Sequence, residues 1–188
     1  MTEIRNGLEK DIHDVKVNTQ GHLDGLAASK YWRQVIDNQE VSFDSIQQHF
    51  LNLTRDFISI QNVSGYEALK SKGLEIIRDD SLRYKIIALY EYDYTTLKKL
   101  EEDYQELQFQ RSYFQQINQL LAKNFEYAKD GQIVAVNLPL QLTEEEKKLL
   151  LSYLWKIDVN RAFILRFYDG VEDKIDALMQ EIEKEIGN

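Results

Sequence analysis

The stretch from Asp80 to Ala128 most constrains the fold, because it contains neither glycine nor proline. Apolar residues recur in it, mostly at steps of three and four with a longer step across Asp93, the spacing that lines one face of an α-helix. These residues are Leu82, Ile86, Leu89, Leu97, Leu100, Tyr104, Leu107, Phe114, Ile117, Leu121 and Phe125. A helix of that length extends about 70 Å, which exceeds the width of a compact domain of this size. The stretch therefore predicts an elongated bundle in which other segments cover its apolar face.

Composition favours one globular domain that spans residues 1–188, since no flexible linker divides the chain. Hydrophobic residues make up 43% and charged residues 29%, which is typical of a folded domain with a real core. The net charge of −9 and the lack of a Lys and Arg cluster argue against nucleic-acid binding, because phosphate contacts require clustered positive charge. The chain has no cysteine, which excludes disulfides, thiolate metal ligands and a cysteine nucleophile.

The C-terminal part of the chain predicts a second long helix. Thr143 is followed by three glutamates, which together form a strong helix-start signature. Apolar residues then alternate at steps of four and three without slipping at Gly170, which is a coiled-coil heptad pattern. The heptad positions are Leu150, Leu154, Ile157, Arg161, Ile164, Tyr168, Val171, Ile175, Leu178 and Ile182. We therefore predict one continuous helix from Glu144 to about Ile186.

The N-terminal segment from Thr2 to about Asn38 also has a helical pattern, although its apolar face is imperfect. Gly21 and Gly25 each weaken a helix by about 1 kcal/mol relative to alanine. We therefore predict a bend or break near these two glycines.

Two short connecting helices are expected between the first and the longest helix. One has apolar steps from Ile46 to Ile60, and the other begins at Ser64 and ends at Gly73 in a positive-φ conformation. Asp79 or Asp80 is then expected to cap the long helix.

Residues 132–142 have an alternating pattern that predicts an extended segment with one buried face. The sequence offers this segment no partner strand, so we interpret it as a crossover packed on helices. An edge strand that pairs with a second copy of the chain is the alternative. The predicted fold is therefore all-α: an elongated antiparallel bundle of three long and two short helices, with an extended crossover near 132–142.

Candidate metal ligands are confined to His13, His22 and His49, and none lies in an HExxH or Glu-x-x-His arrangement. His22 falls on the apolar face of the first helix. A buried, hydrogen-bonded imidazole is the favoured interpretation, with a ligand or switch role as the alternative. No metal or cofactor site is predicted.

Arg111 and Arg161 interrupt apolar seams, as does Asp93, and charges on a seam are costly unless they are paired. The favoured interpretation is an ion pair that fixes helix register; the alternative is a pocket for an anionic ligand at Arg111 or Arg161. Asp93 and Arg111 lie about 27 Å apart along one helix, so they cannot pair with each other. Phosphate-binding loops, serine elbows and catalytic triads are absent from the sequence, and no catalytic residue is predicted.

Residues 66–87, YEALKSKGLEIIRDDSLRYKII, together with Tyr90, resemble the central motif of an uncharacterised bacterial family. The family pattern is similar: tyrosine and leucine before a K-S-x-G turn, a Leu-Ile pair, then L-R-x-x-I opening a long helix. Members of that family carry one N-terminal membrane-spanning helix followed by a mostly helical domain. The resemblance implies that Met1 follows a trimmed membrane anchor and that the domain is extracytoplasmic (periplasmic). No activity is established for the family, so the resemblance implies no functional residues.

These observations lead to two functional hypotheses. The first is a non-enzymatic, membrane-tethered domain that binds a partner protein, associates with itself or transmits a signal through its long helices. The second is a small-ligand sensor with an anion pocket between helices near Arg111 or Arg161.

Overall fold

We analysed a computed structural model, which describes residues 1–42 and 44–187. The all-α class is confirmed, because 76% of the chain is helical and the only sheet in the described part has two strands. The chain forms two compact units. Unit 1 comprises residues 1–19, 58–104 and 164–188, and unit 2 comprises residues 20–57 and 105–163. The predicted single domain 1–188 also includes Phe43 and Asn188, which lie outside the described residues.

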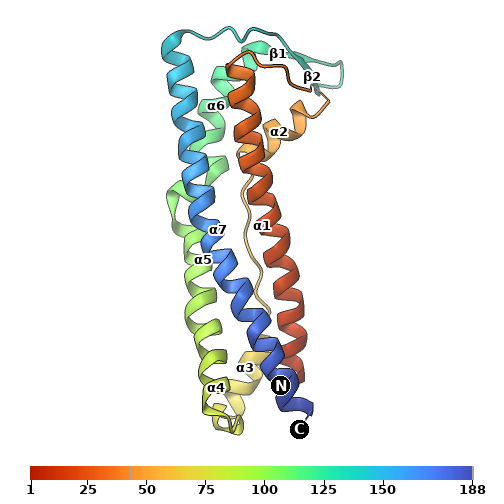
Figure 1. Cartoon of the computed structure of the whole chain (residues 1–188), viewed down its shortest axis with the longest axis vertical. Helices are drawn as coiled ribbons and strands as arrows, with labels where there is room; N and C mark the ends of the chain where they lie inside the picture. The colour runs from red at the N-terminus through yellow and green to blue at the C-terminus, as the bar shows by residue number, and fades with distance from the viewer. Residues whose placement is uncertain (43, 188) are drawn as a thin grey trace. The chain divides into compact units, whose positions relative to one another are not determined.

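Helices α1 (Thr2–Ile36) and α7 (Glu144–Gly187) are each unbroken, and each contributes residues to both units (Figure 1). Unit 1 also contains short helices and turns that lie between α1 and α7 in the sequence. These are α3 (Ser64–Lys72), the 3-10 turn η1 (Leu74–Ile76), α4 (Asp80–Ile87), the π-helical segment η2 (Ala88–Asp93) and α5 (Tyr94–Asp103).

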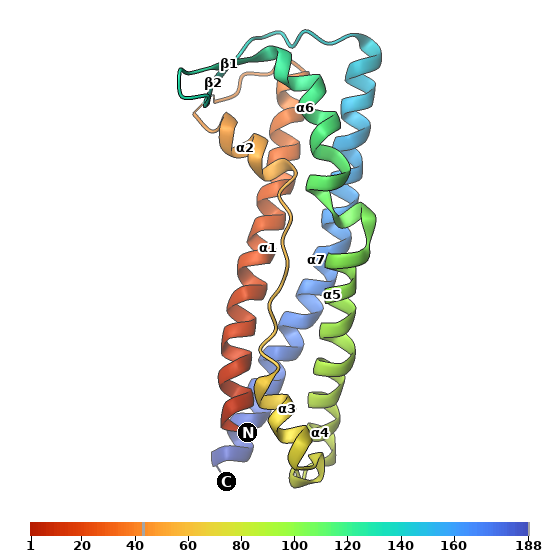
Figure 2. The ribbon, with the colours of Figure 1, turned by 180° about the vertical axis from the view of Figure 1, so that it is seen from behind.

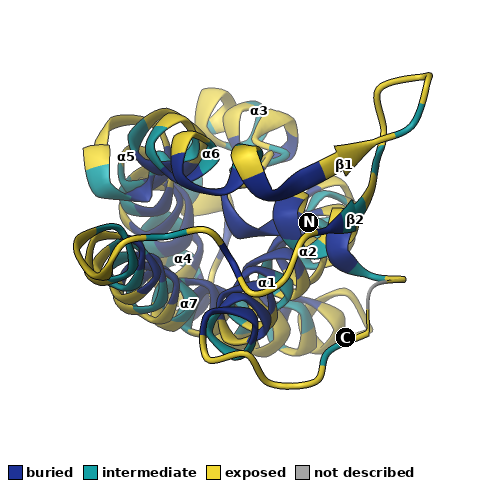
Figure 3. Ribbon diagram, turned by 90° about the horizontal axis from the view of Figure 1, so that it is seen from above, coloured by how far each residue is buried: buried dark blue, intermediate teal, exposed yellow. Residues whose placement is uncertain are grey.

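Within unit 1, α1 and α7 run antiparallel. Arg5 Nε lies 3.2 Å from a carboxylate oxygen of Glu183, and Lys16 Nζ lies 3.5 Å from one of Glu172. Residue numbers in α7 therefore decrease where those in α1 increase, as antiparallel helices require. Each long helix has one buried and one exposed face (Figure 3).

Unit 2 contains the remaining elements, which are short except for its parts of α1 and α7. They are α2 (Ile46–Leu53), η3 (Gln105–Leu107), the π-helical η4 (Gln110–Phe114), α6 (Gln115–Leu121), η5 (Ala122–Asn124), β1 (Phe125–Tyr127) and β2 (Ile133–Val136). Its core is aromatic: the Trp32 ring lies 6.2 Å from Phe50 and 6.1 Å from Phe125, centroid to centroid.

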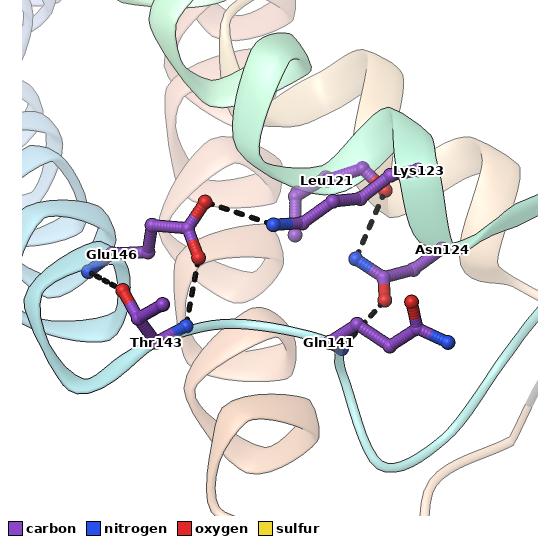
Figure 4. A network of polar contacts seen from close by, with 6 residues as sticks. All are labelled: Leu121, Lys123, Asn124, Gln141, Thr143 and Glu146. Atoms are coloured by element: carbon purple, nitrogen blue, oxygen red, sulfur yellow. Dashed lines mark hydrogen bonds and ion pairs between the residues drawn. The ribbon is translucent and has the colours of Figure 1, made fainter.

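The prediction for α7 is confirmed. The helix passes through Gly170 without a break, and its ten heptad positions are at most 4% exposed. The backbone N–H of Glu146 donates to Thr143 Oγ1 at 3.2 Å, and the N–H of Thr143 donates to the Glu146 carboxylate at 2.7 Å (Figure 4). This reciprocal pair is the capping box that the sequence predicts.

The predicted break in α1 is wrong, because the helix continues through both glycines. A Cβ atom at Gly21 would lie 2.1 Å from the Phe57 ring, and one at Gly25 would lie 2.2 Å from Arg161 Nε. Both glycines therefore allow close approach of another side chain to the helix. The buried positions of α1 follow a regular four-three pattern that includes polar residues, which is why the apolar pattern looked imperfect. The positions in this pattern are Ile4, Leu8, Asp11, Val15, Asn18, His22, Gly25, Ser29, Trp32 and Ile36, and Gly21, Ala28, Tyr31 and Val35 are buried beside them.

The prediction of one helix from Asp80 to Ala128 is wrong. The helical segment that begins at Asp80 ends at Asp103, and Tyr104 adopts an extended conformation with ψ of 105°. A new helical segment begins near Gln110. The Ser112 hydroxyl in its first turn donates to the Gln105 carbonyl at 2.8 Å. Helical periodicity continues in the sequence across this interruption, so periodicity alone could not reveal it.

Residues 125–136 correct a second prediction. Phe125–Tyr127 is strand β1 rather than helix, and it pairs antiparallel with β2 inside the chain. The predicted crossover near 132–142 therefore begins as a strand with an internal partner, and only its later part is an unpaired connection to α7. Asn124 supports that connection, because its side-chain oxygen accepts from the N–H of Gln141 at 2.7 Å (Figure 4).

The first short helix is shorter than predicted. Helix α2 ends at Leu53, and residues 55–63 form neither helix nor strand before α3 begins (Figure 2). The positive φ of Gly73, 95°, is confirmed. Asp79 is confirmed as the cap of α4, since its carboxylate accepts from the N–H groups of Ser81 and Leu82.

Candidate ligand-binding site

A cavity of about 240 Å³ lies in unit 1, between the segment formed by α4 and η2 and the C-terminal part of α7. Leu89 and Leu178 form an apolar floor, and each is at most 2% exposed. Ala88 and Ala177 also line it, and their short side chains leave the space open. A dry cavity of about 150 Å³ is enough to hold benzene, so this one has room for a small organic molecule.

Asp93 is the most deeply buried charged group of the cavity. Its side chain is 9% exposed, and its carboxylate lies 2.6 Å from Nζ of Lys174, whose side chain is 57% exposed. Burial of a carboxylate is costly unless it is paired. Lys174 therefore neutralises Asp93 from the solvent side. This pair agrees with the interpretation of Asp93 as a paired seam residue.

Two exposed tyrosines border the same region. Tyr84 is 72% and Tyr92 is 69% exposed, which leaves most of each ring open to solvent. A second cavity of about 450 Å³ shares Tyr84, Ala88, Asp93 and Lys174 with the first. The two cavities thus form one surface depression with an apolar floor and an aromatic border.

The other charged groups around this depression have partners outside it. Lys85 Nζ lies 2.5 Å from the Glu181 carboxylate. Glu91 accepts from Lys70 Nζ at 2.6 Å and from the Tyr66 hydroxyl at 2.8 Å. The hydrogen bond from Lys70 lowers the pKa of Glu91 most, and that from Tyr66 lowers it further.

Arg161 lies fully buried in unit 2 and holds the end of α2 and the residues after it. Its Nη2 donates to the carbonyl oxygens of Asn52, Leu53 and Arg55, each at 3.1 Å. The guanidinium carbon lies 4.1 Å from the centroid of the Phe109 ring, a cation–π arrangement. Burial lowers the pKa of Arg161 to about 10, so it is charged at neutral pH.

His22 completes the surroundings of Arg161. Its Nδ1 lies 3.0 Å from Arg161 Nη1, and because a guanidinium can only donate, Nδ1 accepts. Burial, together with the charge of Arg161, lowers the pKa of His22 to about 3. The imidazole is therefore neutral, and the predicted buried, hydrogen-bonded histidine is what the geometry supports.

In unit 1, carboxylates hold residues 58–63 by their backbone amides. The N–H of Ser59 donates to Glu101 at 3.0 Å, that of Ile60 to Asp14 at 2.8 Å, and that of Asn62 to Asp11 at 2.8 Å. These carboxylates come from α1 and α5. They satisfy an extended chain that has no neighbouring strand.

Tyrosine hydroxyls bind two of these carboxylates from the other side. Tyr94 donates to Asp11 at 2.8 Å, and Tyr168 donates to Glu101. Burial raises the pKa of Glu101, against the lowering effect of the hydrogen bonds from Tyr168 and Ser59. Asp11 and Glu101 therefore have a structural role in unit 1, because their carboxylates bind backbone amides and tyrosine hydroxyls.

The two arginines predicted from the sequence occupy different environments. Arg161 is fully buried and bound to carbonyl groups, whereas Arg111 is exposed on η4. They do not share one pocket. The surroundings of Arg161 support a structural role, although carbonyl oxygens rather than a carboxylate are its direct partners.

The three histidines have different surroundings. His13 is exposed, His22 is bound to Arg161, and His49 stacks on Tyr31 with 4.2 Å between ring centroids. Across residues 1–42 and 44–187, no group of three or more His, Asp or Glu side chains could hold a metal ion. In the same ranges, no helix is long and apolar enough to cross a membrane.

Sequence reasoning missed the cavity next to η2. One signal was available: Asp93 lies four residues after Leu89 and four before Leu97, on the apolar face. The position of Lys174 opposite Asp93 depends on how α7 packs, which no local pattern reveals.

Comparisons with protein-family models, curated proteins and solved structures give no match to this chain. The resemblance of residues 66–87 to a bacterial membrane-anchored family therefore stays a prediction.

Proposed function

We propose that this chain is a non-enzymatic binding domain that takes up a small molecule in the cavity next to η2. The single observation that carries the proposal is an apolar cavity with one buried carboxylate and two exposed tyrosines at its border. Small-molecule sites commonly have this composition, mostly apolar with few placed polar groups.

A non-catalytic role is supported by what the buried ionisable groups do. Asp11 and Glu101 bind backbone amides, and Arg161 binds backbone carbonyls. These groups hold the chain in place instead of converging on a cavity. The resemblance supports tethering to a bacterial membrane on its extracytoplasmic side, and the elongated antiparallel bundle stays part of this proposal.

A cavity-filling substitution tests the proposal. Ala177→Phe puts a ring into the cavity from an exposed position of α7, whereas Ala162→Phe makes the same change at an exposed position of unit 2. A thermal-shift screen of small apolar and amphipathic molecules is expected to find ligands that stabilise the native chain and Ala162→Phe but not Ala177→Phe. Ligands at a hundred times their Kd stabilise by about 2.7 kcal/mol. Equal stabilisation of both variants would overturn the assignment to this cavity.

A partner-protein interface is the second candidate, and one observation in unit 2 favours it. Trp155 is 58% and Val159 is 46% exposed, and they lie four residues apart on one face of α7. Exposed tryptophan is enriched among residues that dominate binding energy at protein interfaces.

Light scattering after size-exclusion chromatography, with pull-down from bacterial membrane extracts, tests this candidate. Association is expected to weaken on Trp155→Ala and to persist on Leu149→Ala, since Leu149 is exposed on another face of α7. A strict monomer that captures no partner would count against it.

A further inference from the structure

We infer that the ligand of this cavity is a small organic amine whose ammonium group replaces that of Lys174 on Asp93. The inference rests on the proposed function, because it names the chemical class of the molecule that the cavity holds. Lys174 is already such a group: an ammonium on a hydrocarbon chain, 2.6 Å from a buried carboxylate.

The difference in burial between the two partners decides the sign of the ligand's charge. An anion would bind by drawing Lys174 away, and it would leave Asp93 buried without a counter-ion. Leaving a buried carboxylate without its counter-ion in this way is strongly unfavourable. An ammonium ligand would release Lys174 instead. Its side chain is 57% exposed, so it returns to water while the ammonium group of the ligand keeps Asp93 paired.

The walls of the depression fit the rest of an amine. Leu89, Ala177 and Leu178 offer apolar contact to a hydrocarbon body next to the carboxylate. Tyr84 and Tyr92 border the depression, and a cation close to a tyrosine face gains further attraction.

The other charged side chains that line the depression next to Asp93 each have a partner within unit 1. Lys85 also lines the cavity, but its ammonium is 2.5 Å from Glu181. Glu91 lines the outer depression and is bound to Lys70 and Tyr66. Among these carboxylates Asp93 is buried and its lysine partner is exposed, whereas both members of the Glu91–Lys70 pair are exposed.

The test compares three probes of similar size: hexylammonium, hexanol and hexanoate. Binding to the whole chain is followed by backbone-amide chemical shifts and by calorimetry at pH 7.5. Hexylammonium is expected to bind saturably and roughly tenfold or more tightly than either other probe, as a charged hydrogen bond contributes about 1.5–3 kcal/mol.

Three variants locate the effect. Lys174→Ala removes the competing ammonium and is expected to tighten hexylammonium binding roughly three- to fivefold, the equivalent of up to about 1 kcal/mol. Lys148→Ala changes the net charge equally at an exposed position in unit 2 and is expected to leave binding unchanged. Asp93→Asn is expected to weaken it at least roughly tenfold.

Two results would overturn the inference while the proposed function survives. One is hexanol or hexanoate binding in the cavity as tightly as hexylammonium. The other is Lys174→Ala binding hexylammonium no more tightly than Lys148→Ala. If no probe binds, and library ligands also fail to distinguish Ala177→Phe from Ala162→Phe, the proposed function fails together with the inference.

Discussion

Buried charged side chains hold the backbone at the end of α2 in unit 2 and of residues 59–62 in unit 1, and the charges in the two units are opposite. In unit 2 the cation Arg161 donates to three carbonyl oxygens at and after the end of α2. In unit 1 the carboxylates of Asp11, Asp14 and Glu101 accept from the amides of residues 59, 60 and 62. Arg161 satisfies carbonyl groups that a helix leaves unpaired at its C-terminus, and the carboxylates satisfy amides of a segment that pairs with no strand.

The difference teaches that the two units respond to protons in opposite ways. Arg161 is charged at neutral and acidic pH, because its lowered pKa is still about 10. In unit 2 the group that responds to acid is therefore the neighbouring His22, which is neutral in the folded chain. In unit 1 the group whose pKa is shifted is Glu101, which itself accepts from a backbone amide. Burial makes the charged form of Glu101 costly.

The largest expected effect comes from removing the cation of unit 2. Arg161→Met leaves three carbonyl groups and the His22 nitrogen without their donor, and we expect it to lower the free energy of unfolding by about 3–5 kcal/mol. Urea denaturation measures it. Arg111→Met, at an exposed position of the same unit, is expected to change stability by less than about 0.5 kcal/mol. Similar costs for both variants would refute the clamp at Arg161.

A matched pair of glycines tests how closely α1 approaches Arg161. Gly25→Ala places a Cβ 2.2 Å from Arg161 Nε and is expected to destabilise by about 2–3 kcal/mol. Gly170→Ala meets nothing within 4 Å, and it is expected to stabilise by about 0.5–1 kcal/mol, because alanine is the better helix former. Thermal and urea unfolding of both variants check the opposite signs. Equal effects would show that Gly25 is not a contact point.

Acid is expected to weaken the unit 2 arrangement through His22. Its pKa is about 3 in the folded chain and 6.5 ordinarily, so its contribution is complete above pH 6.5 and declines as the pH falls towards 3. The loss is about 1 kcal/mol between pH 6.5 and pH 5.5. His22→Gln is expected to lack this component, whereas His13→Gln, at an exposed position, is expected to keep it. Urea midpoints at the two pH values decide between them.

Base is expected to weaken the unit 1 arrangement through Glu101. Burial raises its folded pKa above the ordinary 4.5, so its contribution is complete below pH 4.5 and is lost as the pH rises through the folded pKa. The slope is at most about 1.4 kcal/mol per pH unit. Glu101→Gln keeps an acceptor for Ser59, and its stability relative to the native chain should rise with pH in this window. A pH-independent difference would contradict the raised pKa.

Helix caps give the smallest expected effects, and they should be alike in the two units. Thr143→Ala removes the capping box of α7 in unit 2, and Asp79→Ala removes the cap of α4 in unit 1. Each is expected to cost about 1 kcal/mol. Chemical denaturation of both variants tests whether local contacts, unlike the buried clamps, act independently of the unit.

The sequence by itself determined the helical class, the whole of α7 and the local caps. The heptad from Leu150 to Ile182 and the Thr143–Glu146 box depend on residues within a few positions of each other, and a helix brings such residues together without help from the rest of the chain.

The tertiary structure alone decided where the other helices end and which polar residues are buried. Nothing near Leu53 or Tyr104 in sequence signals a helix end, whereas Arg161 binds the carbonyl of Leu53 from 108 positions away. Asp11 and Asn18 complete the buried face of α1 because each finds a hydrogen-bond partner, Asp11 in Tyr94 and Asn18 in Asp14. The Asp93–Lys174 pair spans 81 positions. Hydrogen bonds over such separations depend on how the helices pack, so the local periodicity of the sequence cannot predict them.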